Sequence, residues 1–240
     1  YTLQSMADGG IFDQVGGGFH RYATDERWHL PHFEKMLYDN AQLASVYLDG
    51  QDLIDAPWPS ETAAKILDYM IRDLMRPEGG FCSAEDADSY PGKPGVGHKK
   101  EGAFYGWRLS EVQSVLPRQD ADIMAYHFGL EPDGNVRHDP SGEFAGINVP
   151  FCAHTLAETA ARFALSEEKA GRILSRGRDI LFAERNRRPR PHLDDKILTA
   201  WNGLALSALS KGFLVLGHKK YLEAARKTAV FIHENLYDEA

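Results

Sequence analysis

The sequence predicts a mainly helical protein in which helix packs on helix and short strands are confined to loops. Apolar residues recur at helical spacing along most of the 240 residues. The helical segments are separated by glycine-rich loops that are dense in polar and aromatic side chains. A double glycine with an aromatic residue after it closes a helix at Gly9–Phe12 and again at Gly79–Phe81. Repeated helical hairpins with elaborate loops on one side favour a toroid or a solenoid.

The first loop and the helix behind it, Gly16–Leu43, organise the prediction. Three consecutive glycines would each cost a helix about 1 kcal/mol, so Gly16–Tyr22 is expected to be loop or short strand. Pro31 suits a first helical turn, because its missing N–H would be unpaired there anyway. We therefore predict a helix that begins near Pro31–Glu34 and ends near Asp52. Its apolar face carries Leu37, Ala41, Ala44 and Leu48.

The next two elements follow from a cap and from a change of pattern. Ser60 is the expected N-cap of a second helix. The apolar face of that helix carries Ala63, Ile66, Leu67, Met70, Ile71 and Leu74. From Gly79 to Trp107 we expect a polar hairpin, with its two ends paired and its tip at residues 91–100. Strand is predicted only in this hairpin and in Gly16–Tyr22.

The second half of the chain is read from caps and from glycine stops. Two capping boxes each predict a helix start, Ser110 with Gln113 and Thr155 with Glu158. A helix is also expected around 120–128, and residues 130–150 are expected to be irregular. Ser166 is the expected N-cap of a long helix. A later helix carries Trp201 on its inward face and ends at Gly217, and a last helix reaches Leu236.

Composition excludes several classes of function. The net charge is −8 and no basic stripe is present, which excludes a nucleic-acid partner. No apolar run has the length that spans a bilayer, so no membrane partner is expected. Cys82 and Cys152 form no CxxC pair, which favours a reducing compartment and predicts a cytoplasmic location. The histidine spacing fits no metal site, and neither a metal nor another cofactor is expected.

Three polar stretches interrupt the helical pattern and hold the candidate site residues. The run SAEDADS contains Glu85, Asp86 and Asp88, and closely placed carboxylates can divide into one acid and one base. Glycoside hydrolysis uses such a pair, although a solvated acidic loop or an adventitious cation site is the favoured explanation of a lone acidic run. Asp194 and Asp195 lie where a helix begins, and the helix macrodipole stabilises negative charge there.

Histidine and aromatic residues extend the same interpretation. One of His20, His29 or His32 could act as a general base, because imidazole titrates near neutral pH; a structural role is the alternative for each. Trp201 offers an aromatic face for a sugar ring, and Asn202 supplies a hydrogen-bond donor and an acceptor. Aromatic side chains mixed with carboxylates and amides are typical of a carbohydrate cleft. The same mixture could also line the inside of a helical ring.

Three long motifs carry a resemblance to a known family: WHLPHFEKMLYDNAQL, GGFCSAEDADS followed by EGAFYGW, and RPHLDDKILTAWNGLAL. Together they resemble the thioredoxin-domain-containing proteins of the YyaL-like, spermatogenesis-associated type. Members of that family join a thioredoxin-like domain to a helical domain similar to six-hairpin glycosidases and N-acylglucosamine 2-epimerases. The resemblance implies that residues 1–240 are one fragment of an all-α, incomplete (α/α)6 toroid, without the thioredoxin-like domain and the remaining hairpins.

Two functions are carried forward, and the expected partner is a small-molecule ligand, most simply a carbohydrate. The first is acid–base chemistry on a sugar, as in a glycoside hydrolase or a sugar epimerase. The alternative is a non-catalytic carbohydrate- or protein-binding scaffold attached to a thioredoxin-like module. The predicted catalytic residues are His32, Glu85, Asp86, Asp88, Asp194 and Asp195. The predicted substrate-binding residues are Trp28, Glu34, Tyr38, Asp39, Asn40, Lys196, Trp201 and Asn202. We also expect the isolated fragment to self-associate or to be marginally stable.

Overall fold

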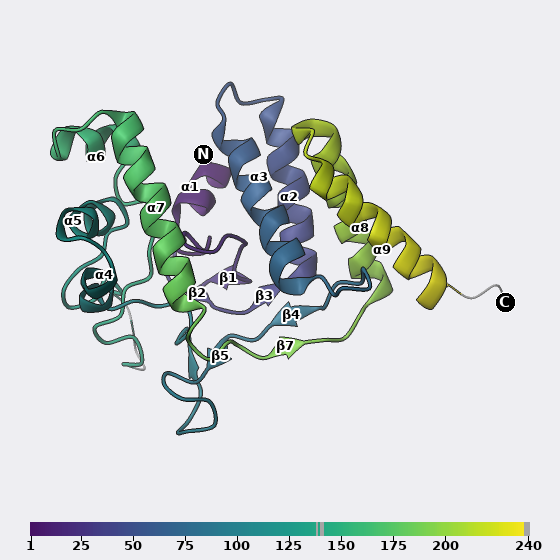
Figure 1. The fold of residues 1–240 in the computed structure, drawn as a ribbon, viewed down its shortest axis with the longest axis horizontal. Coiled ribbons are helices and arrows are strands. Elements are labelled where there is room, and N and C mark those ends of the chain that lie inside the picture. The colour runs from purple at the N-terminus through teal and green to yellow at the C-terminus, as the bar shows by residue number, and fades with distance from the viewer. Residues whose placement is uncertain (138, 140–141, 238–240) are drawn as a thin grey trace. The chain divides into compact units, whose positions relative to one another are not determined.

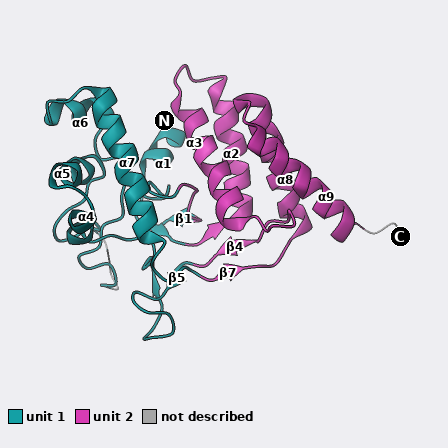
Figure 2. Ribbon diagram, viewed as in Figure 1, with its two compact units in different colours: residues 1–16, 22–33, 87–191 teal, residues 17–21, 34–86, 192–240 magenta. Residues whose placement is uncertain are grey.

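The computed structural model describes residues 1–137, 139 and 142–237, and it divides into two compact units (Figure 2). Unit 1 comprises residues 1–16, 22–33 and 87–191, and unit 2 comprises residues 17–21, 34–86 and 192–240. Both units are therefore discontinuous in sequence. None of the described helices is both long enough and apolar enough to cross a bilayer.

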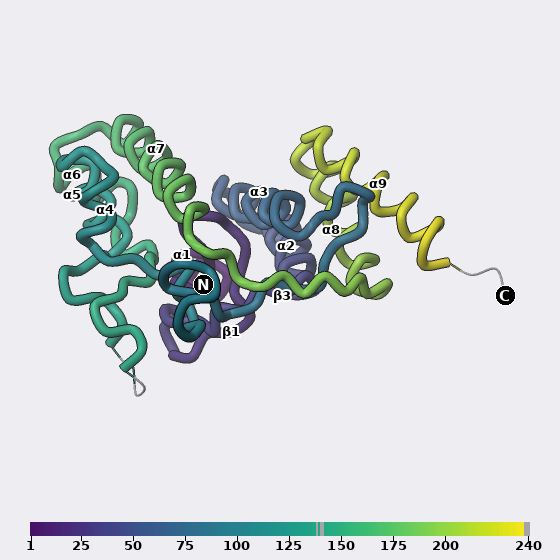
Figure 3. Tube along the Cα trace, turned by 60° about the horizontal axis from the view of Figure 1, so that its bottom comes forward, coloured from purple at the N-terminus to yellow at the C-terminus, as the bar shows by residue number. Residues whose placement is uncertain are grey.

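Unit 2 is built from two helical hairpins that pack side by side (Figures 1 and 3). The first hairpin comprises α2 (Leu37–Gln51) and α3 (Trp58–Tyr69), which continues into the π-helix η1 (Met70–Leu74). The second comprises α8 (Thr199–Leu216) and α9 (Lys219–Asn235). Helix α2 contacts both α3 and α8. Fully buried aliphatic and aromatic residues lie along these contacts: Leu37, Ala44, Tyr47, Ile66, Leu67, Ala208, Leu209 and Tyr221.

A small three-stranded sheet lies at the end of unit 2 where α2 and α8 begin (Figure 1). Its strands are β3 (Lys35–Met36), β4 (Ala84–Glu85) and β7 (Leu193–Asp194), in the order β3-β4-β7. Both pairings are antiparallel, with Lys35 opposite Glu85 and Ala84 opposite Asp194. Strand β3 runs directly into α2, so the sheet fixes where that helix begins.

Unit 1 combines short helices with two small hairpins. Its helices are α1 (Thr2–Asp8), α4 (Leu109–Val115), α5 (Arg118–His127), α6 (Leu156–Arg162) and α7 (Glu167–Arg185). Helix α7 contacts α4, α5 and α6, as Figure 1 shows. Strand β1 (Tyr22–Ala23) pairs with β2 (Pro31–His32), and β5 (Asp88–Ser89) pairs with β6 (Lys100–Glu101), both antiparallel.

The interior of unit 1 contains apolar packing and one buried ion pair. The core around α7 includes Trp107, Val112, Ile123, Met124, Phe128, Leu174 and Leu181. Arg185, at the end of α7, binds both carboxylate oxygens of Asp13 at 2.8 Å, and both side chains are less than 5% exposed. This two-pronged pairing is the arrangement in which a buried guanidinium is stable.

Several predictions about the fold are confirmed. The protein is mainly helical with a few short strands. Thr155 and Glu158 form the predicted capping box at the start of α6, and Ser166 accepts a hydrogen bond from the Lys169 N–H as the N-cap of α7. Gly217 ends α8 with φ 72, in the left-handed conformation that glycine adopts readily. Residues 130–150 are irregular wherever they are described.

Four predicted helix starts were wrong. Asp194 and Asp195 were expected where a helix begins, but Asp194 lies in strand β7, and α8 begins only at Thr199 with no acidic residue in its first turn. The first helix begins at Leu37, not near Pro31–Glu34, because Lys35 and Met36 form strand β3 with the distant segment β4. Helix α3 begins before Ser60, with Pro59 in its first turn. Helix α4 begins at Leu109, one residue before the predicted cap Ser110. The carboxylate that caps its first turn belongs to Glu111, not to the predicted partner Gln113, and accepts a hydrogen bond from the Arg108 N–H at 2.7 Å.

The strand predictions hold in part. The hairpin between Gly79 and Trp107 exists, but its paired strands are only β5 and β6, and its tip at residues 91–100 is exposed. The opening part of the segment instead joins β3 and β7 through β4. Strands β2, β3 and β7 lie outside both of the predicted strand regions. Pairing between such distant segments has no local sequence signal, and that explains the miss.

Candidate functional site

The sheet β3-β4-β7 brings together one strand from each of the three polar stretches of the sequence. Strand β3 carries Lys35, β4 carries Glu85, and β7 carries Asp194. Asp86 continues this edge, since its N–H donates to the His192 carbonyl at 2.8 Å. Eleven of the predicted site residues therefore belong to unit 2, whereas Trp28, His32 and Asp88 belong to unit 1.

Two side chains of opposite charge are buried on one face of this sheet. Lys35 is 1% exposed and Glu85 is 3% exposed, and they are direct cross-strand neighbours. The Lys35 Nζ donates to the Gly17 carbonyl at 2.8 Å and lies 4.4 Å from the centre of the Tyr69 ring. The Tyr69 hydroxyl donates to Glu85 Oε2 at 3.0 Å. Burying ionisable groups costs free energy unless they are hydrogen-bonded, and these contacts supply the required partners.

Asn40 holds the first glycine-rich loop against the start of α2. Its Oδ1 accepts a hydrogen bond from the Phe19 N–H at 2.7 Å, and its Nδ2 donates to the carbonyls of Phe19 (3.0 Å) and Met36 (2.9 Å). We call this arrangement the first asparagine clasp. It satisfies both main-chain groups of a buried loop residue, which would otherwise be left unpaired.

Asn202 forms a second asparagine clasp with the same pattern. Its Oδ1 accepts from the Phe81 N–H at 2.7 Å, and its Nδ2 donates to the carbonyls of Phe81 and Leu198, both at 3.1 Å. Asn40 and Asn202 are both 0% exposed. Both side chains hold buried main-chain groups in this structure, and their predicted contacts with a substrate stay predictions.

Asp39 is a carboxyl group of unit 2 whose pKa lies far above its ordinary value. It lies in the first turn of α2, where the macrodipole favours a negative charge. Burial has the opposite effect and is stronger: it raises the pKa of Asp39 to about 6, assisted by Glu34 and opposed by Arg21 and Tyr38. The Asp39 Oδ2 is buried and has no hydrogen-bond partner in the described part of the chain. A carboxyl group that titrates near neutral pH can both donate and accept a proton.

Polar and aromatic side chains surround Asp39. The Arg21 guanidinium pairs with Glu34 Oε2 at 2.9 Å, and a hydrogen bond to Tyr38 raises the pKa of Arg21. The Tyr38 ring lies 4.7 Å from the ring of Trp201, centre to centre, and both rings are partly exposed. The start of α2 thus combines a titrating carboxyl, a cation and an aromatic pair contributed by both hairpins.

The carboxylates at the end of β7 are more exposed than those near α2. Asp194 pairs with the Lys196 Nζ at 2.8 Å, and this contact lowers the pKa of Asp194. Asp195 is 73% exposed and lies 3.7 Å from the Arg76 guanidinium. Their predicted catalytic roles stay predictions.

The predicted site residues of unit 1 lie around its small hairpins. The His32 Nδ1 lies 2.6 Å from Glu101 Oε1, and its ring stacks on Tyr22 at 5.0 Å. A carboxylate on one imidazole nitrogen orients the ring as a base requires. Asp88 lies in β5, and Trp28 adopts a positive φ of 61 in the loop before β2. In the described part of the chain no three His, Cys, Asp or Glu residues cluster so as to hold a metal.

Sequence reasoning missed Arg21 and Tyr69 as partners of predicted site residues. It placed Glu101 opposite the acidic run, where it does face Asp88, but it missed the contact of Glu101 with His32. Arg21 directly follows the glycine-rich loop, so its place in the organising stretch was a usable signal. Tyr69 is on the apolar face of a helix and reads as core. Glu101 is isolated in sequence from His32, and only the fold brings the two together.

Over its whole length the chain is similar to a group of curated proteins. It is 44% identical over 252 residues to human spermatogenesis-associated protein 20 and 42% identical over 250 residues to the mouse protein of the same name. These matches support the family that the three motifs predict. The chain also shares 39% identity with protein B0495.5 of Caenorhabditis elegans. Each match takes in at least 99% of this chain but only 31–34% of the relative, so the chain spans about a third of their length.

Other comparisons add little. The chain matches no protein-family model. Among solved structures, a D-mannose isomerase is 13% identical, with 97% of this chain and 49% of that chain covered, and a sugar epimerase from a ruminal bacterium is 12% identical, with 99% and 69% covered. The TM-score is 0.31 in both cases, which is too low to support an argument about fold or function.

Proposed function

We propose that this chain carries an acid–base site for a sugar-like substrate at the start of α2, with Asp39 as the group that exchanges the proton. The observation that carries the proposal is the Asp39 carboxyl itself. One of its oxygens is buried without a hydrogen-bond partner in the described part of the chain, and its pKa is raised to about 6. Unpaired buried carboxylate oxygens are costly, and they are found where a protein needs an acid or a base.

The surroundings of Asp39 suit a substrate with several hydroxyl groups. Tyr38 and Trp201 offer partly exposed ring faces, and aromatic rings pack well against the C–H face of a sugar. Arg21 is exposed and supplies donors for substrate oxygens. Proton removal beside a carbonyl, as in sugar isomerisation or epimerisation, requires one group that titrates near neutral pH, and Asp39 meets that requirement. The incomplete toroid is part of the same proposal and accounts for the paired hairpins of unit 2.

The test uses the purified protein and a panel of aldoses, ketoses and N-acetyl sugars. Conversion is followed by chromatography and by incorporation of solvent deuterium, and glycoside hydrolysis is measured in parallel. We expect Asp39→Asn to lower turnover of any accepted sugar by about 100- to 10,000-fold, the usual contribution of a general acid or base. Asp52→Asn, at the exposed C-terminal end of the same helix, is the matched control.

Two results would decide against the proposal. If Asp39→Asn and the parent convert a sugar at the same rate, Asp39 does not carry the proton. If the parent binds sugars by calorimetry, loses that binding in Trp201→Ala and converts none of them, then the non-catalytic binding function replaces the enzyme.

A further inference from the structure

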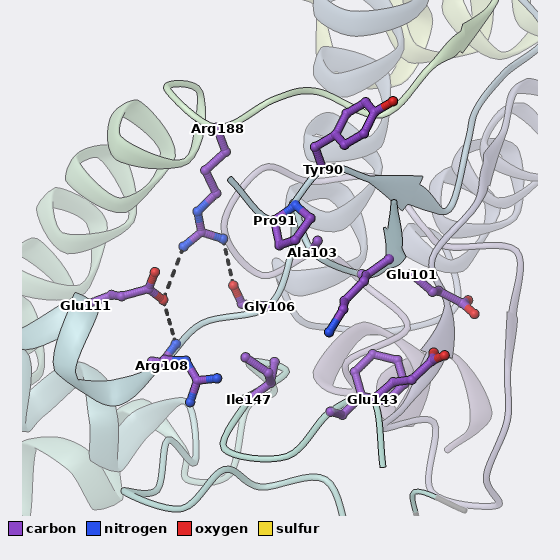
Figure 4. Close-up of a pocket in the computed structure, with 13 residues that line it drawn as sticks. Tyr90, Pro91, Glu101, Ala103, Gly106, Arg108, Glu111, Glu143, Ile147 and Arg188 are labelled. Atoms are coloured by element: carbon purple, nitrogen blue, oxygen red, sulfur yellow. Dashed lines mark hydrogen bonds and ion pairs between the residues drawn. The ribbon is translucent and has the colours of Figure 1, made fainter. Parts of the chain in front are cut away.

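Unit 1 contains a pocket of about 370 Å³ that the proposed function does not use (Figure 4). It lies between the β5–β6 hairpin, the start of α4 and the segment around Ile147. Tyr90, Pro91, Phe144 and Ile147 supply its apolar walls. This volume falls within the range of small-molecule sites, which combine apolar walls with a few polar groups.

One arginine of the pocket is part of its wall. Arg188 donates through Nη1 to the carbonyls of Phe104 (2.9 Å) and Gly106 (2.6 Å), and its guanidinium lies 4.0 Å from the centre of the Trp107 ring. Figure 4 shows it held between the Gly106 carbonyl and the Glu111 carboxylate. Its side chain is only 19% exposed. Arg188 is therefore fixed by the protein and is not the group that would meet a ligand.

Three acidic side chains line the pocket: Glu101 and Glu111 are engaged within the protein, and Glu143 is exposed. Glu111 accepts a hydrogen bond from the Arg108 N–H at 2.7 Å and lies 3.5 Å from the Arg188 guanidinium. Glu101 lies 2.6 Å from the His32 Nδ1. Both carboxylates thus already have polar partners within the protein.

Arg108 differs from these groups. Its backbone N–H binds Glu111, but within the described residues its guanidinium has neither an ion-pair nor a hydrogen-bond partner. The guanidinium is nevertheless placed, because it lies against the backbone of Gly146, where an added Cβ would come within 2.6 Å of Nη1. The side chain is exposed at the pocket. A positioned guanidinium without a counter-charge is a ready partner for an anion.

We propose that this pocket binds a small organic anion, with its carboxylate or phosphate group on Arg108 and its apolar body against Phe144 and Ile147. The anion gives the Arg108 guanidinium the ion-pair partner that it lacks among the described residues. Lys100, which is exposed at the same pocket, adds positive charge on the approach. The carboxylate and the phosphate share the chemistry that a guanidinium recognises, and the experiment separates them.

The probes are benzoate, phenyl phosphate and the neutral isostere benzamide, titrated into the isotopically labelled protein and followed by NMR. We expect saturable shifts for at least one anion at the amides of residues 100–108 and 143–147. Benzamide should bind at least about tenfold more weakly, since it cannot form a charge-assisted pair. A stronger response to benzoate assigns the site to carboxylates, and a stronger response to phenyl phosphate assigns it to phosphates.

Variants test the role of Arg108. Arg108→Gln should weaken anion binding by about tenfold or more, and Arg108→Lys should give an intermediate loss because the charge remains without the planar fork. Arg118→Gln, an exposed arginine of α5 outside the pocket, should leave binding unchanged. Unchanged melting temperatures would show that the variants are folded. Equal binding of benzamide and the anions, equal binding by Arg108→Gln, or no saturable binding of any probe would overturn the proposal.

Discussion

Each helical hairpin of unit 2 binds the buried backbone of a loop phenylalanine with an asparagine, but different side chains lie behind the two contacts. In the first clasp Asn40 binds Phe19, and in the second Asn202 binds Phe81, with the same three hydrogen bonds. In each hairpin a glycine two residues before that phenylalanine lies against a helix carbonyl. A Cβ on Gly17 (φ 76) would lie 2.7 Å from the Lys65 oxygen, and a Cβ on Gly79 (φ 111) would lie 2.5 Å from the Lys227 oxygen. The asparagine clasp and the close glycine contact therefore occur in both hairpins.

The side chains behind the two clasps differ. Lys35 stands five residues before Asn40, and Ile197 stands five residues before Asn202. The carbonyl of Gly17 accepts from the Lys35 Nζ at 2.8 Å, whereas that of Gly79 accepts from the Thr228 hydroxyl at 3.0 Å. The second hairpin thus uses a neutral hydroxyl where the first hairpin uses a buried ammonium group, which lies close in sequence to Asp39.

The largest effect is expected from removing either clasp. Asn40→Ala and Asn202→Ala should each destabilise the protein by about 3–5 kcal/mol, because each leaves the buried main-chain groups of a phenylalanine unpaired. Urea unfolding gives the two values, and Asn235→Ala on the exposed end of α9 should cost less than about 1 kcal/mol. If one clasp costs several times as much as the other, the two devices are not equivalent.

A smaller loss is expected when Lys35 alone is replaced. Lys35→Ile should cost about 2–3 kcal/mol, since the Gly17 carbonyl and Glu85 lose a buried donor and a neighbouring positive charge. Adding Ile66→Thr transfers the hydroxyl of the second hairpin to the first, and we expect it to restore at least half of the loss. The double-mutant cycle is measured by urea unfolding. Additive effects of the two changes would contradict the transfer of one solution to the other hairpin.

Replacing the two loop glycines tests whether the hairpins share the same close approach. Gly17→Ala and Gly79→Ala should each destabilise by about 2 kcal/mol, because a positive φ is unfavourable for alanine and the added Cβ meets a carbonyl oxygen. Thermal unfolding followed by circular dichroism measures both. Gly95→Ala, which also has a positive φ but open space around it, separates the backbone cost from the steric one. Equal losses at all three positions would show that the contact contributes nothing.

The smallest expected effect concerns Asp39. Its pKa is raised from 3.8 to about 6, so the folded state holds the proton more tightly than the unfolded chain does. The resulting stability is complete below about pH 4 and is lost as the pH rises towards 6. Asp39→Asn should therefore stabilise the protein at pH 7 by about 1 kcal/mol after allowance for solvent screening, with little effect at pH 4. Stability curves that stay parallel from pH 4 to pH 7 would exclude a raised pKa at this residue.

Local sequence signals predicted the elements of this protein better than they predicted their partners. Thr155, Ser166 and Gly217 act within a few residues of themselves, and their roles were readable from the chain. The clasps were not, because Asn202 binds Phe81 across 121 positions of sequence. For the same reason the apparent repeat of Gly9–Phe12 with Gly79–Phe81 was misaligned. The partner of Gly79–Phe81 is Gly17–Phe19, and only the hydrogen bonds reveal it.

The sequence predicted that residues at the start of α2 lie close to residues of the second hairpin, but not how deeply each of them is buried. Polar residues at the start of α2 marked the region, and Tyr38, Asp39 and Trp201 do lie together there. Amide side chains looked like substrate contacts because burial cannot be read from residue type. Asn40 is completely buried, whereas Asp39 beside it holds the carboxyl with the raised pKa.

The middle position of β4 in its sheet has a consequence for biosynthesis. Strand β3 and the first hairpin leave the ribosome early, but β7 and α8 follow only after all of residues 87–191 have been made. At a translation rate of about 5–20 residues per second, this delay is on the order of 10 s. During that time one edge of β4 and the apolar face of α2 that later meets α8 are exposed. Nascent chains of this protein should therefore depend on chaperones until Asn202 closes the second clasp.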